Sequence, residues 1–169
     1  MTESEDNPYK PPEAYLVQAS QDKSILEFKR FSAWGVFGLT IITLGIYPYY
    51  WMYTRAKVIN SVHDDKIPMA WPTSLFVIFI LSYATSFIGE SNEAIIANLV
   101  ITVVYLVLYV IVLFKIRNRL QVIINRSGNK EYRLGPLMTF FFYAIFLQYK
   151  INECIDDLNP ADGVAEIEA

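Results

Sequence analysis

Four long stretches without a charged side chain constrain the fold of this sequence more than any other feature. They cover residues 31–53, 71–89, 94–114 and 134–149. At ~1.5 Å of rise per helical residue, about 20 apolar residues cross a hydrocarbon layer roughly 30 Å thick. The pattern predicts an all-α fold, an integral membrane helical bundle with about four hydrophobic helices.

Composition argues against the alternative, a soluble protein in which the four apolar helices form the core. Apolar residues make up 54% of the chain and charged residues 18%, whereas about 25% charged residues is typical of soluble domains. The run 94–114 is the clearest span, because it offers almost no polar face to water. Ser91 is placed to cap the start of this helix, and Glu93 lies favourably in its first turn.

Two of the other runs are short for a membrane span. The run 71–89 has about the minimum length and opens with Pro72, which a first helical turn tolerates. The run 134–149 has 16 residues between Arg133 and Lys150. It spans only if the lysine extends its amine to the membrane surface or the bilayer thins locally.

The run 31–53 contains two helix breakers, Gly45 and Pro48, near its end. Proline removes one helical hydrogen bond and clashes with the carbonyl four residues earlier, here that of Leu44. We expect a kinked helix that crosses fully, which is the simpler solution; the alternative is a re-entrant segment that dips in and returns. A full crossing puts the N-terminal arm outside, although the basic pair before the run favours the inside. Re-entry keeps both flanks inside.

Aromatic and basic residues gather at the end of the same run, and we interpret them as an interfacial anchor. Tyr and Trp rings prefer the headgroup level of a membrane, and anionic cytoplasmic lipid attracts the Lys and Arg that follow. The anchor residues are Tyr47, Tyr49, Tyr50, Trp51, Tyr53, Arg55 and Lys57.

The helix of the run 94–114 is expected to continue beyond the bilayer by about three turns. Its continuation carries an apolar stripe, suited to the membrane surface, opposite polar residues. The stripe consists of Ile116, Leu120, Ile123 and Ile124. The sequence Ser127-Gly128-Asn129 is expected to end the helix.

Three short stretches place an Ile-Asn pair where a helix has left the apolar zone. They are AKVIN at 56–60, QVIIN at 121–125 and YKIN at 149–152. The echo is too short to establish an internal repeat, and helix ends often use Asn.

Lys and Arg in the connections predict the orientation. The short loop 90–93 has none, whereas the loops 54–70 and 115–133 are basic. By the positive-inside rule the basic loops face the cytoplasm and the loop 90–93 lies outside, as in a multi-pass inner-membrane protein.

The two ends of the chain differ in composition from the membrane domain at 31–152. Residues 1–30 are acidic and contain Pro, which is unlike a secretory signal and predicts a mostly disordered arm. Residues 153–169 form an acidic tail, whose first part is expected to stay helical through Leu158 until Asn159-Pro160 stops it. Cys154 is expected to be an unreactive thiol.

The stretch TLGIYPYYWMYTRAKVIN at 43–60 and the later FLQYKIN at 146–152 resemble a bacterial membrane family catalogued as domain of unknown function 4234. The resemblance covers about 31–152. Its motif positions in this sequence are Gly45, Tyr47, Trp51, Asn60, Gln148 and Asn152. Pro48 stands where the family commonly has glycine. The resemblance implies a location in the bacterial inner membrane and no established activity.

The sequence favours an interaction, scaffold or accessory role over catalysis. No catalytic site, metal site, cofactor or small-molecule substrate is indicated, since His63, Asp64 and Asp65 read as a solvated turn. Nucleic-acid binding is not expected either. Membrane lipid is the expected partner, together with other membrane proteins or a second copy.

The alternative function is a small-solute conduit or transporter component. It would use a polar stripe on one face of the helix at 94–114, because these groups would avoid lipid. The stripe consists of Asn98, Thr102, Tyr105 and Tyr109.

Overall fold

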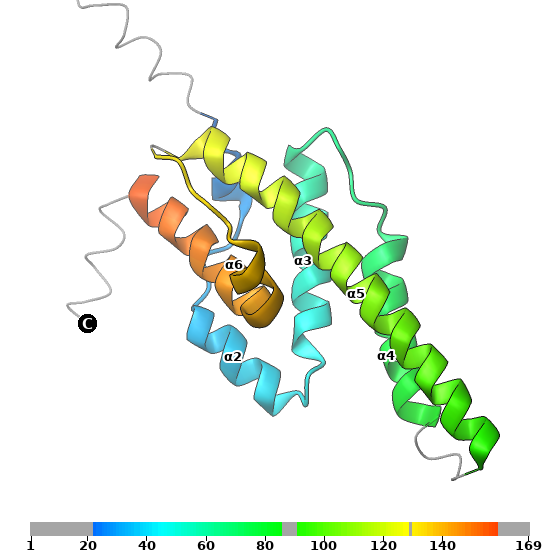
Figure 1. Ribbon diagram of the computed structural model, residues 1–169. Helices are drawn as coiled ribbons and strands as arrows, with labels where there is room; N and C mark the ends of the chain where they lie inside the picture. The colour runs from blue at the N-terminus through cyan, green and yellow to red at the C-terminus, as the bar shows by residue number, and fades with distance from the viewer. Residues whose placement is uncertain (1–21, 86–90, 129, 159–169) are drawn as a thin grey trace, which may run out of the picture.

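The computed structural model describes residues 22–85, 91–128 and 130–158. These parts of the chain form helices and contain no strand, so the predicted all-α fold is confirmed for them (Figure 1). The elements are the 3₁₀ helix η2 (Ser24–Glu27) and the α-helices α2 (Ala33–Ile42), α3 (Tyr47–Val62), α4 (Ala70–Thr85), α5 (Asn92–Ser127) and α6 (Pro136–Leu158).

Only one helix among the described residues is long and apolar enough to cross a membrane. This helix is α5, with 36 residues. The apolar helices α2 and α4 have 10 and 16 residues. By length and composition, therefore, one of the four predicted spans is a candidate membrane-crossing helix. How the shorter apolar helices relate to a membrane depends on how they pack against the other helices.

The run 31–53 folds as a helical hairpin, so the favoured reading, one kinked helix that crosses fully, is wrong. α2 ends at Ile42, α3 starts at Tyr47, and the chain reverses direction between them (Figure 1). Pro48 lies in the first turn of α3, where its missing N–H needs no helical partner. The break lies at residues 43–46, before the proline.

A single hydroxyl group joins the two helices of this hairpin. Thr43 Oγ1 donates to the Leu39 carbonyl at 2.7 Å and accepts from the Tyr47 N–H at 2.9 Å. The first bond lies at the end of α2 and the second at the start of α3, where helices leave backbone groups without helical partners. Thr43 therefore satisfies both sides of the break with one side chain.

The backbone of the turn adopts a Schellman motif. The Gly45 N–H bonds to the Thr40 carbonyl at 2.8 Å, and the Leu44 N–H bonds to the Ile41 carbonyl at 3.0 Å. Both turn residues have positive φ, 50° at Leu44 and 86° at Gly45. Glycine adopts such an angle without strain, which explains Gly45, whereas Leu44 holds a φ that residues with a side chain rarely adopt.

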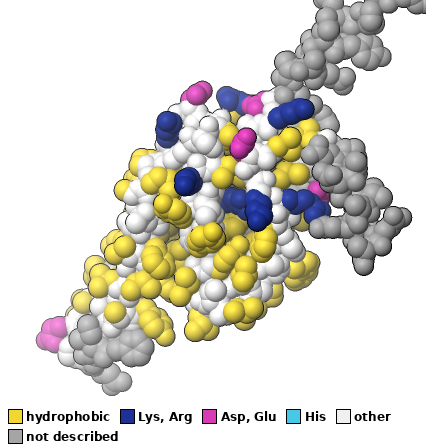
Figure 2. Space-filling view, turned by 180° about the vertical axis from the view of Figure 1, so that it is seen from behind, with side chains coloured by type: hydrophobic (Ala, Val, Ile, Leu, Met, Phe, Trp, Pro, Cys, Tyr) yellow, Lys and Arg dark blue, Asp and Glu magenta, His cyan; other side chains and the backbone are white. Residues whose placement is uncertain are grey.

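Most of the buried core lies at one end of the molecule, which we call the charged end. This end is built from η2, α3 from Trp51 onward, the C-terminal halves of α5 and α6, and the connections 63–69 and 130–135. Figure 2 shows most of the Lys, Arg, Asp and Glu side chains of that face gathered at this end. Its core includes Ile25, Phe28, Trp51, Ile59, Ile67, Ile116, Leu120, Ile123, Ile124, Tyr132, Ile151 and Cys154.

Two sequence expectations change at the charged end. The apolar stripe of α5, from Ile116 to Ile124, is at most 1% exposed and packs in this core, so it is unavailable to a membrane surface. Residues 22–30 are also ordered, because η2 buries Ile25 and Phe28, and Ile25 N–H bonds to Ser127 Oγ at 3.3 Å. The prediction of a disordered arm is wrong for these residues, and 1–21 lie outside the described residues.

The opposite, apolar end exposes large hydrophobic side chains. It consists of α2, most of α4 and the N-terminal halves of α5 and α6, and Figure 2 shows hydrophobic atoms covering its visible face. Exposed residues include Trp34, Ile42, Leu44, Val77, Tyr83, Ile96, Leu99, Val103, Val107, Leu137 and Phe141. α4 and α5 extend side by side beyond the other helices (Figure 1).

The bounds of α5 and α6 follow the sequence signals. Ser91 caps α5 by accepting from the Ala94 N–H at 3.2 Å, and the helix ends at Ser127, as predicted. α6 bends at Tyr143, whose φ of 20° and ψ of −104° are non-helical. It then runs without a break through the expected boundary at 152 to Leu158, the last residue that the structure describes. Residues 159–169 of the acidic tail lie outside the described residues.

We predict that Gly45→Ala lowers the stability of the folded protein by about 1 kcal/mol, because Ala is strained at a φ of 86°. A Cβ at this position meets no atom within 4 Å, so the backbone angle alone causes the loss. Thermal unfolding of the detergent-solubilised protein measures the effect. Gly38→Ala is the matched control, since its Cβ also meets no atom and its backbone is helical. Equal melting temperatures for both variants would contradict the strained turn.

Candidate functional site

A buried hydrogen-bond network joins α3 to α6 at the centre of the charged end. The side-chain oxygen of Gln148 accepts from Trp51 Nε1 at 3.0 Å and from Arg55 Nη2 at 2.8 Å. The amide nitrogen of Gln148 donates to Asn152 Oδ1 at 2.8 Å. Gln148 is 0% exposed, so these bonds replace all contact with water. Trp51 and Arg55 on α3 and Gln148 and Asn152 on α6 thus form one network, although the two pairs lie almost 100 positions apart in the sequence.

The same network holds the segment that leads into α2. Asn152 Nδ2 donates to the Phe31 carbonyl at 2.7 Å, and the Phe31 N–H donates back to Asn152 Oδ1 at 3.4 Å. Arg55 Nη2 also donates to the Lys29 carbonyl at 3.3 Å. The network therefore fixes where α2 starts relative to α3 and α6, and so sets the position of the hairpin.

Arg55 is a buried cation held by neutral acceptors. It is 8% exposed, forms no ion pair with any described residue, and its Nε has no hydrogen-bond partner among them. Its guanidinium lies 5.7 Å from the ring centre of Trp51, within cation–π range. A buried charge depends strongly on its remaining partners. Gln148 is therefore the critical acceptor in this site.

The three Asn residues of the Ile-Asn echo perform the same task at three places. Asn60 binds the backbone of Ile67 in both directions, at 2.7 Å to its carbonyl and 2.6 Å from its N–H. Asn152 binds Phe31 in the same way, and Asn125 accepts from the Tyr132 N–H at 2.9 Å. Each side-chain amide secures an extended segment that runs beside a helix end. This shared task accounts for the echo without invoking duplication.

The predicted interfacial anchor divides between the interior and the surface. Trp51, Arg55 and Tyr49 are buried, and Tyr49 forms a hydrogen bond with the hydroxyl of Tyr105 on α5. Tyr47 is half-buried against the rings of Phe31 and Tyr50. The exposed members are Tyr50, Tyr53 and Lys57. An anchoring role remains a prediction for these three, whereas the buried members organise the fold.

The predicted polar stripe of α5 faces neighbouring helices. Asn98 Oδ1 accepts from Ser82 Oγ and Thr85 Oγ1 on α4, each at 3.5 Å. Thr102 donates to the Asn98 carbonyl of its own helix at 2.8 Å. Tyr105 meets Tyr49 of α3, and Tyr109 packs edge-on against Tyr143 of α6, with 6.2 Å between ring centres. Asn98, Tyr105 and Tyr109 therefore make interhelical contacts, and the conduit function stays a prediction.

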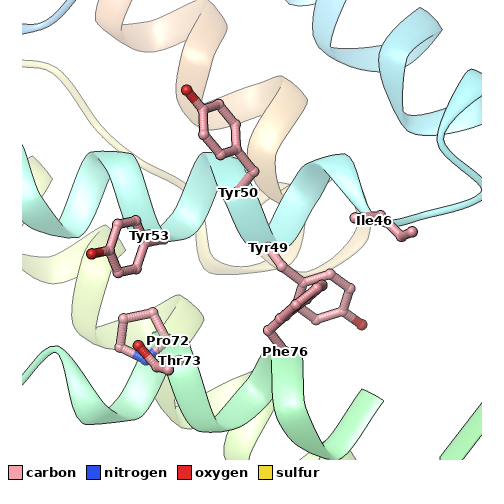
Figure 3. A pocket seen from close by; sticks show the side chains of 7 residues that line it. All are labelled: Ile46, Tyr49, Tyr50, Tyr53, Pro72, Thr73 and Phe76. Carbon is pink, nitrogen blue, oxygen red and sulfur yellow. The ribbon is translucent and has the colours of Figure 1, made fainter. Parts of the chain in front are cut away.

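An apolar groove lies between α3 and α4 on the exposed side of the hairpin. Its volume is about 380 Å³. Figure 3 shows Tyr53 lying across from Pro72 and Thr73, and Tyr49 close to Phe76. The full lining is Ile46, Tyr49, Tyr50, Tyr53, Pro72, Thr73 and Phe76. Sequence reasoning missed this groove, because it exists only where the α2–α3 reversal sets α3 beside α4.

A second, polar cavity of about 800 Å³ lies between the start of α2 and the end of α6. Its acidic walls carry ion pairs: Arg30 with Asp156 at 2.8 Å, and Lys130 with Asp157 at 2.7 Å and Glu153 at 3.4 Å. Contact with Lys130 lowers the pKa of Asp157, and contact with Asp157 raises the pKa of Lys130. Exposed pairs of this kind contribute about 0–1 kcal/mol each to stability.

The turn at His63 forms local contacts. His63 Nδ1 accepts from the Asp65 N–H at 3.0 Å, and the Asp65 carboxylate pairs with Arg119 at 2.9 Å. Among the described residues, no group of three or more His, Cys, Asp or Glu is placed to hold a metal ion. The geometry of this turn thus binds the connection 63–69 to α5.

Comparison with known proteins gives one match. The family model described as Domain of unknown function (DUF4234) matches residues 31–122. The matched segment contains the hairpin and the motif residues Trp51 and Asn60, and it ends before Gln148 and Asn152. No curated protein and no solved structure matches the chain.

We predict that Gln148→Leu destabilises the protein by about 2–4 kcal/mol, because the Trp51 N–H and the Arg55 guanidinium lose their shared buried acceptor. Thermal unfolding in detergent measures the loss. Tyr149→Phe is the matched control, since Tyr149 is the next residue and is 54% exposed. A Leu variant as stable as the control would show that the network contributes little.

We predict that Cys154 resists alkylation in the folded protein. The side chain is 0% exposed, and burial raises the pKa of its thiol to about 11. At pH 8 the reactive thiolate is therefore on the order of a hundredfold scarcer than for an ordinary thiol. Mass spectrometry after iodoacetamide treatment measures labelling with and without denaturant. Ser61→Cys, at an exposed position, supplies the reactive control within the same molecule; equal labelling of both thiols would refute the prediction.

Proposed function

This chain belongs to the family described as Domain of unknown function (DUF4234), and we propose that it is an integral inner-membrane protein whose charged end is a folded interaction module. The module is presented to the cytoplasm by helices that enter the membrane from that side. Its role is that of a scaffold or accessory subunit for other membrane proteins.

The exposure of α5 carries this proposal. The helix contains an 18-residue window with a mean hydropathy of 2.8, of which 6% is buried inside the protein. A core helix of a soluble protein has similar composition, but its apolar residues are buried. An apolar helix with so few buried residues is stable in hydrocarbon and strongly disfavoured in water. Lipid is the medium that suits it.

The packing of the shorter helices suggests how they share this medium. α4 contacts α5 and would rise about 24 Å at ~1.5 Å per residue, so the two helices together suit a crossing hairpin. The α2–α3 hairpin and the N-terminal half of α6 enter from the charged end and return to it (Figure 1). Backbone polar groups at membrane depth need hydrogen-bond partners, and at this turn Thr43 Oγ1 and the Schellman bonds of Leu44 and Gly45 supply them.

Charge supports a cytoplasmic position for the charged end. The basic stretches 54–70, 115–128 and 130–133, much of which belongs to α3 and α5, lie at this end, and so do Lys29 and Arg30, because the α2–α3 hairpin returns the chain to its starting side. Residues 91–93 at the far end of α5 contain no Lys or Arg. A full crossing by 31–53 would put Lys29 and Arg30 outside, against the positive-inside rule. The hairpin keeps them on the cytoplasmic side.

An interaction role fits the charged end better than a reaction does. It has its own core, fixed by the Gln148 network, and a surface on which acidic residues of α6 pair with Lys130 of the connection after α5 and with Arg30 before α2. Such mixed charge favours specific docking over general attraction. The candidate partners are other membrane proteins or a second copy of this chain.

A cysteine-accessibility map tests the topology. In a Cys154→Ser background, single substitutions Lys23→Cys, Asp64→Cys and Asn92→Cys place thiols at exposed positions before α2, after α3 and at the start of α5. We expect a membrane-impermeant maleimide to label only Asn92→Cys in intact spheroplasts, and all three variants after lysis. Labelling of Lys23→Cys but not Asp64→Cys in intact cells would restore the full crossing by 31–53.

Carbonate extraction of membranes supplies the second measurement. We expect the protein to stay in the pellet at high pH, as an α4–α5 crossing requires. Release into the supernatant would overturn the proposal of an integral protein, whatever the labelling pattern.

A further inference from the structure

The groove between α3 and α4 has the composition of a lipid site, and we propose that it holds one phospholipid, with an acyl chain along the groove and an anionic headgroup beside Lys57. This inference rests on the proposed function, because it requires the groove to face the membrane. It adds a ligand class and a place for that ligand on the protein.

The walls of the groove suit a hydrocarbon chain. Ile46, Tyr49, Pro72 and Phe76 supply apolar surface, and the volume of about 380 Å³ lies within the ~300–1,000 Å³ usual for ligand pockets. Pro72 and Tyr49 are buried, while Phe76 is 40% exposed at the open side. The groove therefore has a firm floor and opens laterally, where chains of the surrounding bilayer would enter.

The polar atoms at the groove are placed for ester and phosphate oxygens. The hydroxyl of Tyr53, which lies across from Pro72 and Thr73 (Figure 3), forms no hydrogen bond with any residue that the structure describes, and its ring is exposed. A tyrosine hydroxyl in apolar surroundings needs an acceptor. The acyl-ester and phosphate groups of a phospholipid are such acceptors, whereas an apolar helix of another protein offers none on its side chains.

The charge at the mouth of the groove selects an anionic headgroup. Lys57 lies one helical turn beyond Tyr53 on the same face of α3, toward the charged end. It is exposed and forms no ion pair within the described part of the chain. No acidic residue lines the groove. A cation without an adjacent carboxylate attracts phosphatidylglycerol more strongly than the zwitterionic phosphatidylcholine.

The direction of the groove agrees with the proposed topology. Ile46 lies at the α2–α3 turn, deep in the apolar end, while Tyr53 and Lys57 lie nearer the charged end (Figures 1 and 3). A lipid of the cytoplasmic leaflet would thus place its chain beside the turn and its headgroup at the level of Lys57. The acyl chain of the lipid then contacts the apolar residues of the groove, and its anionic headgroup lies beside Lys57.

Native mass spectrometry of the full-length protein tests the inference. Protein in detergent is titrated separately with dioleoyl phosphatidylglycerol and dioleoyl phosphatidylcholine, and single-lipid adducts are counted. We expect one phosphatidylglycerol to bind, and Thr73→Phe, which fills the groove from an exposed position, to reduce that adduct at least about tenfold. Val107→Phe is the matched control, because it adds the same ring at an exposed position of α5 outside the groove.

The headgroup is tested by a second pair of variants. Lys57→Gln should reduce the preference for phosphatidylglycerol over phosphatidylcholine by about fivefold, the effect of one basic residue at an anionic surface. Lys66→Gln, which removes an exposed lysine from the connection 63–69, should leave the preference unchanged.

The outcomes separate the two proposals. If the protein stays in carbonate-washed membranes but Thr73→Phe and Val107→Phe bind the lipid equally, the groove inference fails and the proposed function stands. The groove inference also fails, and the proposed function stands, if Thr73→Phe disrupts a dimer and leaves the lipid adducts unchanged. In that case the occupant of the groove is a second copy of the chain. Release of the protein by carbonate overturns both proposals together.

Discussion

The structure depends on one constraint: wherever the chain leaves a helix and turns back, its backbone N–H and C=O groups need new partners. Polar side chains supply them. Thr43 serves both helices of the α2–α3 hairpin, Asn60 secures the connection to α4, and Asn125 secures the connection to α6. Asn152 does the same for the segment before α2. Thr43, Asn60 and Asn125 stand near helix ends, and Asn152 lies within α6, so the path of the chain follows from a small number of amides and one hydroxyl.

The Gln148 amide has a wider effect, because its oxygen accepts from both Trp51 and Arg55 and so links α3, the second helix of the hairpin, to α6. With α3 fixed in this way, its other face lies beside α4 and leaves the groove open. The proposed lipid site is therefore a consequence of the network on the opposite face of α3. The Gln148 network and the groove thus use different faces of α3.

Several elements could be predicted from the sequence because their signals are local. Ser91 caps the start of α5, and the helix ends at Ser127, as helix-capping rules indicate. Three expectations failed because they depended on distant partners. Trp51 and Arg55, expected in the interfacial anchor, form hydrogen bonds with Gln148, which is almost 100 positions away. The stripe from Ile116 to Ile124 is buried in the protein core, and Ile25 and Phe28 are buried where their segment packs against α5 and α6. A pattern in one segment shows that a face is apolar, and it does not show what covers that face.

The sequence by itself determined that the chain is helical, that its charges are segregated from its apolar runs, and where the long helices begin and end. Those properties follow from residue spacing and from the free energy of transferring each side chain out of water. Only the tertiary structure decided that 31–53 turns back at 43–46. A proline and a glycine permit a kink as readily as a reversal, and the choice rests on Thr43 meeting both helices and on Asn152 and Gln148 holding their far ends.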